Sequence, residues 1–189
     1  MQATSLRRAL YVLFARLLAA PPDRSLYARL RDEGFVRLAE AQGIDLTGDL
    51  LDERDEQASA LELEIEYAEV ARQVSLRASD YSEATEDPVV ALDAFLREHG
   101  LVVDREAALP VDHLAIALGV MAELSDQHER EGSEEARVRA GAFLHRHILP
   151  WADRALAAFS AASGRLFYRG LAAMVGAYLA VERATYRPA

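Results

Sequence analysis

Apolar residues recur at three- and four-residue spacing along most of the chain, which is the pattern of amphipathic helices. Two prolines at 21 and 22 end the first such segment, because proline cannot continue a helix. Residues 52–73 alternate Glu with apolar residues as a strand would, but their Ala, Leu and Glu content favours a helix. The pattern predicts helices over about 6–18, 24–41, 52–73, 88–99, 112–131, 134–148 and 151–162, and a last one from 165.

Turn and capping residues separate these predicted helices. Asp87-Pro88 supply an N-cap and a first-turn proline. Asp112 is expected to cap the next helix by accepting backbone N–H bonds, with its charge at the positive end of the helix dipole. His113 would then lie in the first turn, near the rim, as a neutral imidazole at pH 7.

The fold class follows from the absence of any convincing strand or repeat. The sequence predicts an all-α protein, a single-domain bundle of about eight helices over residues 1–189. The polar stretch around 75–87 is the longest loop-like piece, and we expect it to be flexible.

Composition removes several classes of chemistry. The chain has no Cys, which excludes disulfides, thiolate nucleophiles and iron–sulfur clusters. It has no Lys, which excludes a lysine Schiff base and a phosphate-loop lysine. A formal net charge of −10 argues against nucleic acid and fits a basic partner. No apolar run approaches the roughly 20 residues that span a bilayer, and Arg16 interrupts the first one. We therefore expect a cytoplasmic protein without stable membrane insertion, whose N-terminal segment is a mature helix.

Metal and catalytic patterns are weak. No His has a carboxylate three positions before it, so the Glu-x-x-His pairs of a di-iron bundle are missing. His145 and His147 are two positions apart, and on a helix they point to different faces. We expect no metal and no cofactor. Glu62, Glu66 and Glu69 share one helix face, either as paired carboxylates for acid–base work or as a solvated face.

The adjacent pair Asp112-His113 leaves three interpretations open. It can be a recognition site for a partner, or only a capped helix start in an oligomeric scaffold. It can also be the working pair of a small all-α enzyme or ligand-binding bundle. No nucleophile elbow or phosphate loop accompanies the pair.

The order of three motifs resembles a known family. Pro110–Leu114 reads P-x-D-H-L, His147–Trp151 reads H-x-x-P-W, and Glu66–Ala71 partly matches an E-Y-x-x-L-F box. Over essentially the whole chain, this order resembles the TorD/DmsD/NarJ family of redox-enzyme maturation chaperones. The resemblance implies a helical cytoplasmic protein that is not an enzyme. Such a protein binds the twin-arginine signal peptide, the apo catalytic subunit of a molybdopterin oxidoreductase, or both, and delays export until the cofactor is inserted.

The resemblance also implies where the client binds. The expected client-binding residues are Glu66, Tyr67, Val70 and Ala71 of the box, with Pro110, Asp112 and His113 of the later motif. A signal peptide is basic at one end and apolar along its middle, so carboxylates beside an apolar groove would suit it. Asp112 could pair bidentately with an arginine of the peptide. Val70-Ala71 stand where the family has Leu-Phe, which reduces the apolar contact. Trp151 is expected in the core, and a homodimer remains open.

Overall fold

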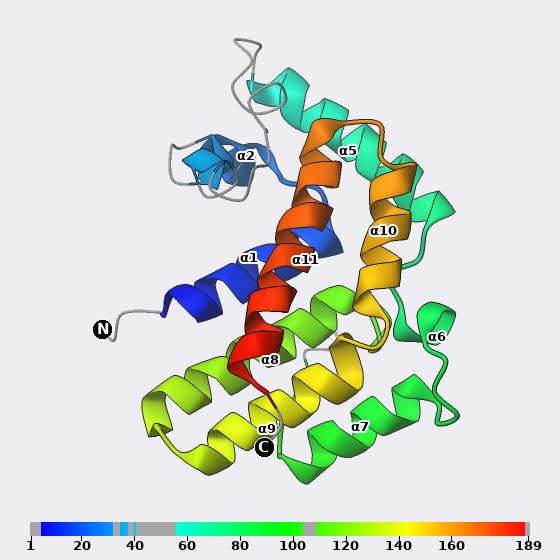
Figure 1. The fold of residues 1–189 in the computed structure, drawn as a ribbon. Helices are drawn as coiled ribbons and strands as arrows, with labels where there is room; N and C mark the ends of the chain where they lie inside the picture. Colours follow the sequence, from blue (N-terminus) through cyan, green and yellow to red (C-terminus); the bar gives the residue numbers. More distant parts are fainter. Residues whose placement is uncertain (1–4, 32–34, 38–39, 41–55, 104–108, 188–189) are drawn as a thin grey trace. The chain divides into compact units, whose positions relative to one another are not determined.

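A computed structural model describes residues 5–31, 35–37, 40, 56–103 and 109–187 (Figure 1). Regular structure in these residues is helical, and their one β contact is an isolated antiparallel bridge between Arg77 and His113. The predicted all-α fold is therefore confirmed. The helical elements of the described residues are α1 (Leu6–Ala19), α2 (Arg24–Leu30), α5 (Glu56–Gln73), α6 (Ala78–Tyr81), α7 (Pro88–Glu98), α8 (Leu114–Glu131), α9 (Glu134–Phe143), the π-helical turn η1 (Leu144–Ile148), α10 (Ala152–Ala162) and α11 (Leu166–Thr185).

The chain forms two compact units that are interleaved along the sequence. Unit 1 consists of Met1–Ala19, Leu76–Asp153 and Leu179–Ala189, and unit 2 consists of Ala20–Ser75 and Arg154–Tyr178. The prediction of a single domain stays a prediction. None of the helices in the described part of the chain is long and apolar enough to cross a membrane.

Local capping fixes several helix boundaries where the sequence predicted them. The Asp87 carboxylate accepts the Val89 N–H at 2.8 Å, and Pro88 occupies the first turn of α7, where no N–H is needed. Gly132 adopts a left-handed φ of 60° and ends α8. The next residue, Ser133, caps α9 through the Ala136 N–H.

One predicted helix is too long. The pattern predicted a helix over 24–41, but α2 ends at Leu30, and residues 35–37 are helical again. Asp23 caps α2 by accepting the Leu26 N–H at 2.8 Å. The remainder of that prediction lies mostly outside the described residues.

The core of unit 1 forms where α1 packs against α8, and α8 in turn packs against α9. The buried face of α1 carries Tyr11, Phe14, Leu17 and Leu18. Each such side chain contributes about 1.5–3 kcal/mol when it leaves water. Glu182 of α11 is also buried here, where it accepts the Tyr11 hydroxyl at 3.0 Å and pairs with Arg7 at 3.2 Å. Burial raises the pKa of Glu182, and this effect outweighs the Arg7 charge.

Unit 2 ties α5 to the start of α11. The Tyr168 hydroxyl donates to the carbonyl of Leu63 at 2.9 Å, and its ring makes edge contacts with Phe159 and Phe167. Leu63 and Val70 are the buried residues of α5 with the largest apolar side chains. They lie seven positions apart, on one face of the helix.

The predicted helix over 134–148 ends differently from the prediction. After Phe143 the chain widens into the π-helical turn η1, where Leu149 N donates to Leu144 O, five residues back, at 3.0 Å. The carbonyl of His147 accepts the Trp151 indole N–H at 2.7 Å. Such turns are rare and often occur at functional sites.

Candidate functional site

The Asp112-His113 pair lies in a loop that is hydrogen bonded to the segment after α5. Backbone bonds run from Ala78 N to Asp112 O at 2.9 Å and from Leu114 N to Leu76 O at 2.8 Å. These bonds flank the Arg77–His113 bridge. The stretch predicted as a polar loop around 75–87 therefore contains an anchored piece and the one-turn helix α6, while its predicted flexibility stays a prediction.

The predicted N-cap is wrong. His113 caps α8, since its Nδ1 accepts the Ala115 N–H at 3.2 Å. Asp112 instead turns its carboxylate toward α6, where it accepts the Ser79 N–H and the Arg77 Nε–H, each at 3.1 Å. Asp112 therefore caps a different helix from the one that follows it in sequence.

Charge and burial at the pair follow from these bonds. Burial raises the pKa of Asp112, but the hydrogen bonds from Ser79 and Arg77 outweigh it, so the pKa lies below its ordinary value. Desolvation lowers the pKa of His113 to about 4. The predicted neutral imidazole is confirmed. The predicted position near the rim is wrong, because His113 is buried. Pro110 is exposed, and its carbonyl accepts the His113 N–H at 3.0 Å.

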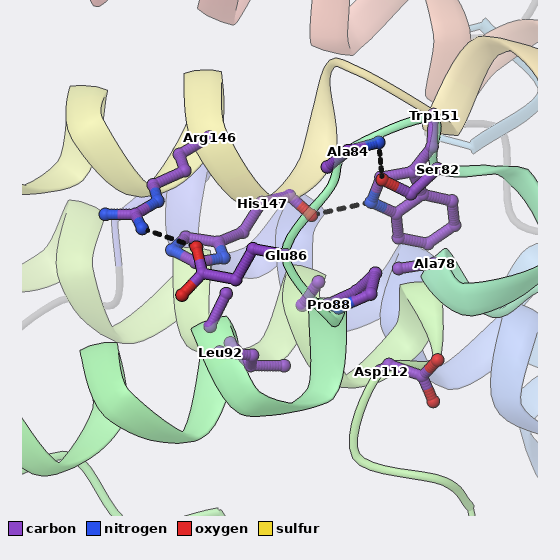
Figure 2. Close-up of a pocket in the computed structure, with 12 residues that line it drawn as sticks. Ala78, Ser82, Ala84, Glu86, Pro88, Leu92, Asp112, Arg146, His147 and Trp151 are labelled. Carbon is purple, nitrogen blue, oxygen red and sulfur yellow. Dashed lines mark hydrogen bonds and ion pairs between the residues drawn. The ribbon is translucent and has the colours of Figure 1, made fainter.

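Asp112 also lines a cavity of about 70 Å³ in unit 1 (Figure 2). The cavity brings Asp112 together with His147 and Trp151, the first and last residues of the H-x-x-P-W motif. Arg146 and Glu86, both exposed, form an ion pair of 2.9 Å among its lining residues (Figure 2). The two later motifs, which are more than 30 residues apart in sequence, therefore contribute to one cavity.

His147 is the unusual polar group of this cavity. Its ring contacts the rings of Phe95 and Phe143, with centroid distances of 5.3 and 5.1 Å, and those two rings also contact each other at 5.0 Å. Desolvation lowers its pKa to about 4, and the Arg146 charge adds to this. Its Nε2 is buried, and no group of the described residues forms a hydrogen bond with it. Sequence reasoning did not select His147 or Trp151 as site residues, although the H-x-x-P-W motif was the signal that could have found them.

In unit 2, the box residues line a second depression, the α5 groove, of about 310 Å³. It is lined by Glu62, Ile65, Glu66, Glu69, Val70, Gln73, Ala162, Gly164 and Arg165. Of the four candidate residues on α5, the structure brings Glu66 and Val70 to this groove. Tyr67 is half-buried with its ring 5.9 Å from that of Tyr168, and Ala71 is exposed; neither lines the groove.

The three glutamates of the α5 groove share one face, as predicted, but they are not equally solvated. Glu66 is buried and accepts the Arg165 backbone N–H at 2.6 Å. Glu62 pairs with the Arg165 guanidinium at 2.7 Å. Glu69 is exposed, and no described side chain pairs with its carboxylate. The interpretation of the whole set as a solvated face is therefore wrong for Glu66, because Arg165 covers it.

Comparison with known proteins agrees with the motif order. A family model described as nitrate reductase delta subunit matches residues 29–157, a range that holds α5, Asp112-His113 and Trp151. Two proteins named "Chaperone protein TorD", from Vibrio vulnificus strains CMCP6 and YJ016, are each 35% identical to the chain over 69 residues. These matches cover 34% of this chain and 32% of each relative, about a third of the length of either. The chain belongs to the nitrate reductase delta subunit family, the TorD/NarJ family that its motifs resemble.

Proposed function

We propose that the protein is a dedicated maturation chaperone for a molybdopterin-containing oxidoreductase. It binds the twin-arginine signal peptide, the apo catalytic subunit, or both, and acts in the cytoplasm before export. It needs no cofactor and performs no catalysis of its own. Family membership supports the general role, and the relatives named as chaperones support it further.

The observation that carries the proposal is the chemistry of the α5 groove. A signal peptide has a positively charged end and an apolar stretch of 7–15 residues. The groove offers the exposed Glu69 carboxylate, and Glu62 pairs with the Arg165 guanidinium, which is 36% exposed. Ile65, which is 53% exposed, supplies an apolar surface beside these charges, and the buried Val70 lies beneath it in the groove lining. A guanidinium of the client can pair with Glu69 and exchange with Arg165 at Glu62.

Asp112 and His113 take part as positioning residues in this proposal. Both are buried, and the Asp112 carboxylate already holds Arg77 and Ser79. Their role is to fix the loop that presents Pro110 and the segment around α6. Arg77 is 41% exposed, so it, rather than Asp112, offers a polar contact at this surface.

The alternative of a small-molecule enzyme using Asp112-His113 finds little support in the cavity beside the pair. Pockets that bury drug-sized ligands measure about 300–1,000 Å³. The cavity beside Asp112 measures about 70 Å³, room for a few water molecules or the tip of one side chain. This size favours a protein client over a free small molecule.

Isothermal titration of the purified chain tests the proposal. The probe is a synthetic twin-arginine signal peptide of a molybdopterin oxidoreductase. We expect binding that weakens with added salt, and that weakens further in the double variant Glu62→Gln/Glu69→Gln. Glu98→Gln, which removes an exposed carboxylate from α7, is the matched control and should bind as the wild type does. No heat change with the peptide, together with no complex with the apo catalytic subunit, would refute the proposal.

A further inference from the structure

Residues 82–87, which connect α6 to α7, line part of the cavity of about 70 Å³ in unit 1. We propose that this segment, the strap, is a cover that opens and closes in the folded protein. The strap is closed over His147 and Trp151 while Glu86 is paired with Arg146, and it opens when that ion pair breaks. Opening exposes the first and last residues of the H-x-x-P-W motif, which the closed strap keeps from solvent.

The strap buries no apolar side chain of its own. Ser82 is half-buried, and residues 83–87 are exposed. The helices on either side differ from it, since Ala78 of α6 and Leu92 of α7 are buried. Segments with few buried apolar contacts open at a lower cost in free energy than the elements that flank them. The strap can therefore leave the cavity while α6 and α7 keep their packing.

Both ends of the strap are fixed by hydrogen bonds to the neighbouring helices. Ser82 N donates to the Ala78 carbonyl at 2.7 Å, and the Ser82 hydroxyl accepts the Ala84 N–H at 3.2 Å (Figure 2). At the other end, the Asp87 carboxylate caps α7. None of these bonds involves η1, so they can persist while the part of the strap between them moves away from the cavity.

The Glu86–Arg146 ion pair links the strap to η1 across 60 positions of sequence (Figure 2). The two groups are 2.9 Å apart, and the side chains of Glu86 and Arg146 are 51% and 65% exposed. An exposed ion pair of this kind adds little net stability, and salt weakens it further. The link is therefore weak enough to break and form again without unfolding of the protein.

The closed state leaves the cavity incompletely packed and one polar atom unsatisfied. The buried Nε2 of His147 forms no hydrogen bond with any of the described residues. Alanine methyl groups make up much of the wall and leave the space between them unfilled: Ala78, Ala84, Ala91 and Ala117. A buried polar atom without a partner and an unfilled cavity both cost free energy. Opening admits water to the imidazole, and this gain offsets part of the contact that is lost.

Trp151 reports on the strap directly, because it is the single tryptophan of the chain and lines the cavity. It is 3% exposed in the closed state, so acrylamide quenching of its fluorescence measures how often the cavity opens. Glu86→Gln removes the charge at nearly the same shape. It should raise the quenching constant about two- to fivefold, the range that an exposed ion pair allows. Glu134→Gln is the matched control, because it removes an exposed ion pair with Arg137 on α9, and neither residue lines the cavity.

Salt tests the same link without any substitution. Raising the NaCl concentration to about 0.5 M should raise the quenching constant of the wild type toward that of Glu86→Gln and leave that variant nearly unchanged. The exchanged pair Glu86→Arg/Arg146→Glu should return the quenching constant at low salt to the wild-type value. Circular dichroism reports whether the variants keep the fold, and the salt titration of the wild type decides the matter if they do not.

Hydrogen exchange identifies which part of unit 1 moves. The backbone amides of residues 83–86 should exchange faster in Glu86→Gln than in the wild type, while those of α1 keep their rate. Stronger quenching of Trp151 without faster exchange in the strap would mean that η1 moves instead, which overturns the inference. It is also overturned if neither salt nor Glu86→Gln changes the quenching, or if Glu134→Gln raises it equally. All these measurements use the free protein, so their outcome does not depend on the proposed function.

Discussion

Replacing Asp112 with asparagine should lower the free energy of unfolding, because the Asp112 carboxylate accepts two hydrogen bonds that an amide cannot both accept. The asparagine oxygen can accept from Ser79 N or from Arg77 Nε, but its NH₂ group then faces the other donor. Leaving one donor unsatisfied beside the buried carboxyl, and losing a charged hydrogen bond, costs about 2 kcal/mol, because both bonds are only partly buried. For a chain of this length that lowers the midpoint of thermal unfolding by about 5–10 °C.

Urea unfolding followed by circular dichroism measures this change at pH 7. Asp87→Asn is the control, because Asp87 also accepts a backbone N–H at a helix start, but in an exposed position. Asparagine is as good an N-cap as aspartate, so the control should lose almost nothing. A loss below about 0.5 kcal/mol for Asp112→Asn would mean that the Ser79 and Arg77 bonds add no net stability, which would refute the reasoning.

The pH dependence of this difference has a defined sign. The folded pKa of Asp112 lies below its ordinary value, so its stabilisation is complete above the unfolded pKa of about 3.9. It is lost as the pH falls through the folded pKa. The gap between wild type and Asp112→Asn should therefore stay constant from pH 7 to about 5 and narrow below about 4. A gap that widens on acidification would contradict the assignment of a charged, hydrogen-bonded carboxylate.

Three further variants test other contacts by urea or thermal unfolding. His113→Asn keeps a capping side chain but removes an imidazole whose pKa falls to about 4 on folding, so stability should drop less than in wild type between pH 6.5 and 4; an equal drop would contradict this. Gly141→Ala places a Cβ 3.2 Å from the Tyr186 carbonyl oxygen, a tight contact whose cost exceeds the gain of about 1 kcal/mol that alanine brings to a helix, so the net loss should be about 1 kcal/mol. A net gain would mean that the Tyr186 backbone shifts to accept the methyl group. Tyr168→Phe leaves the Leu63 carbonyl without its hydrogen-bond donor and should lower the free energy of unfolding by about 1 kcal/mol. An unchanged free energy of unfolding would mean that a water molecule replaces the hydroxyl.

Sequence reasoning succeeded where a short stretch of chain determines the structure. Asp87, Pro88 and Gly132 act on residues within one helical turn of themselves, so the local pattern was enough to predict the start of α7 and the end of α8. The apolar spacing of α1 predicted its buried face for the same reason. These features do not depend on which other helix packs nearby.

The errors at the candidate site share one cause, which is contact between residues far apart in sequence. Asp112 sits in front of a helix, as an N-cap would, but its partners lie 33 and 35 positions earlier. The helical pattern places Glu66 on a face that was expected to be solvated, yet its carboxylate accepts a hydrogen bond from the backbone N–H of Arg165, 99 positions later. The widening of η1 also has no local sequence signal, because π-turns have no composition of their own. Spacing within one helix cannot reveal any of these contacts.

Unit 1 combines segments from both ends of the sequence, and this affects how it folds during synthesis on the ribosome. Glu182 bonds to Tyr11, and the two residues are 171 positions apart. At a synthesis rate of 5–20 residues per second, Glu182 is made about 10–35 seconds after Tyr11. More than half of that time passes before α8, the helix that covers the apolar face of α1, has been made. The apolar face of α1 is therefore exposed during synthesis until α8 has been made, so this proposed chaperone itself passes through an incompletely folded state that exposes apolar surface.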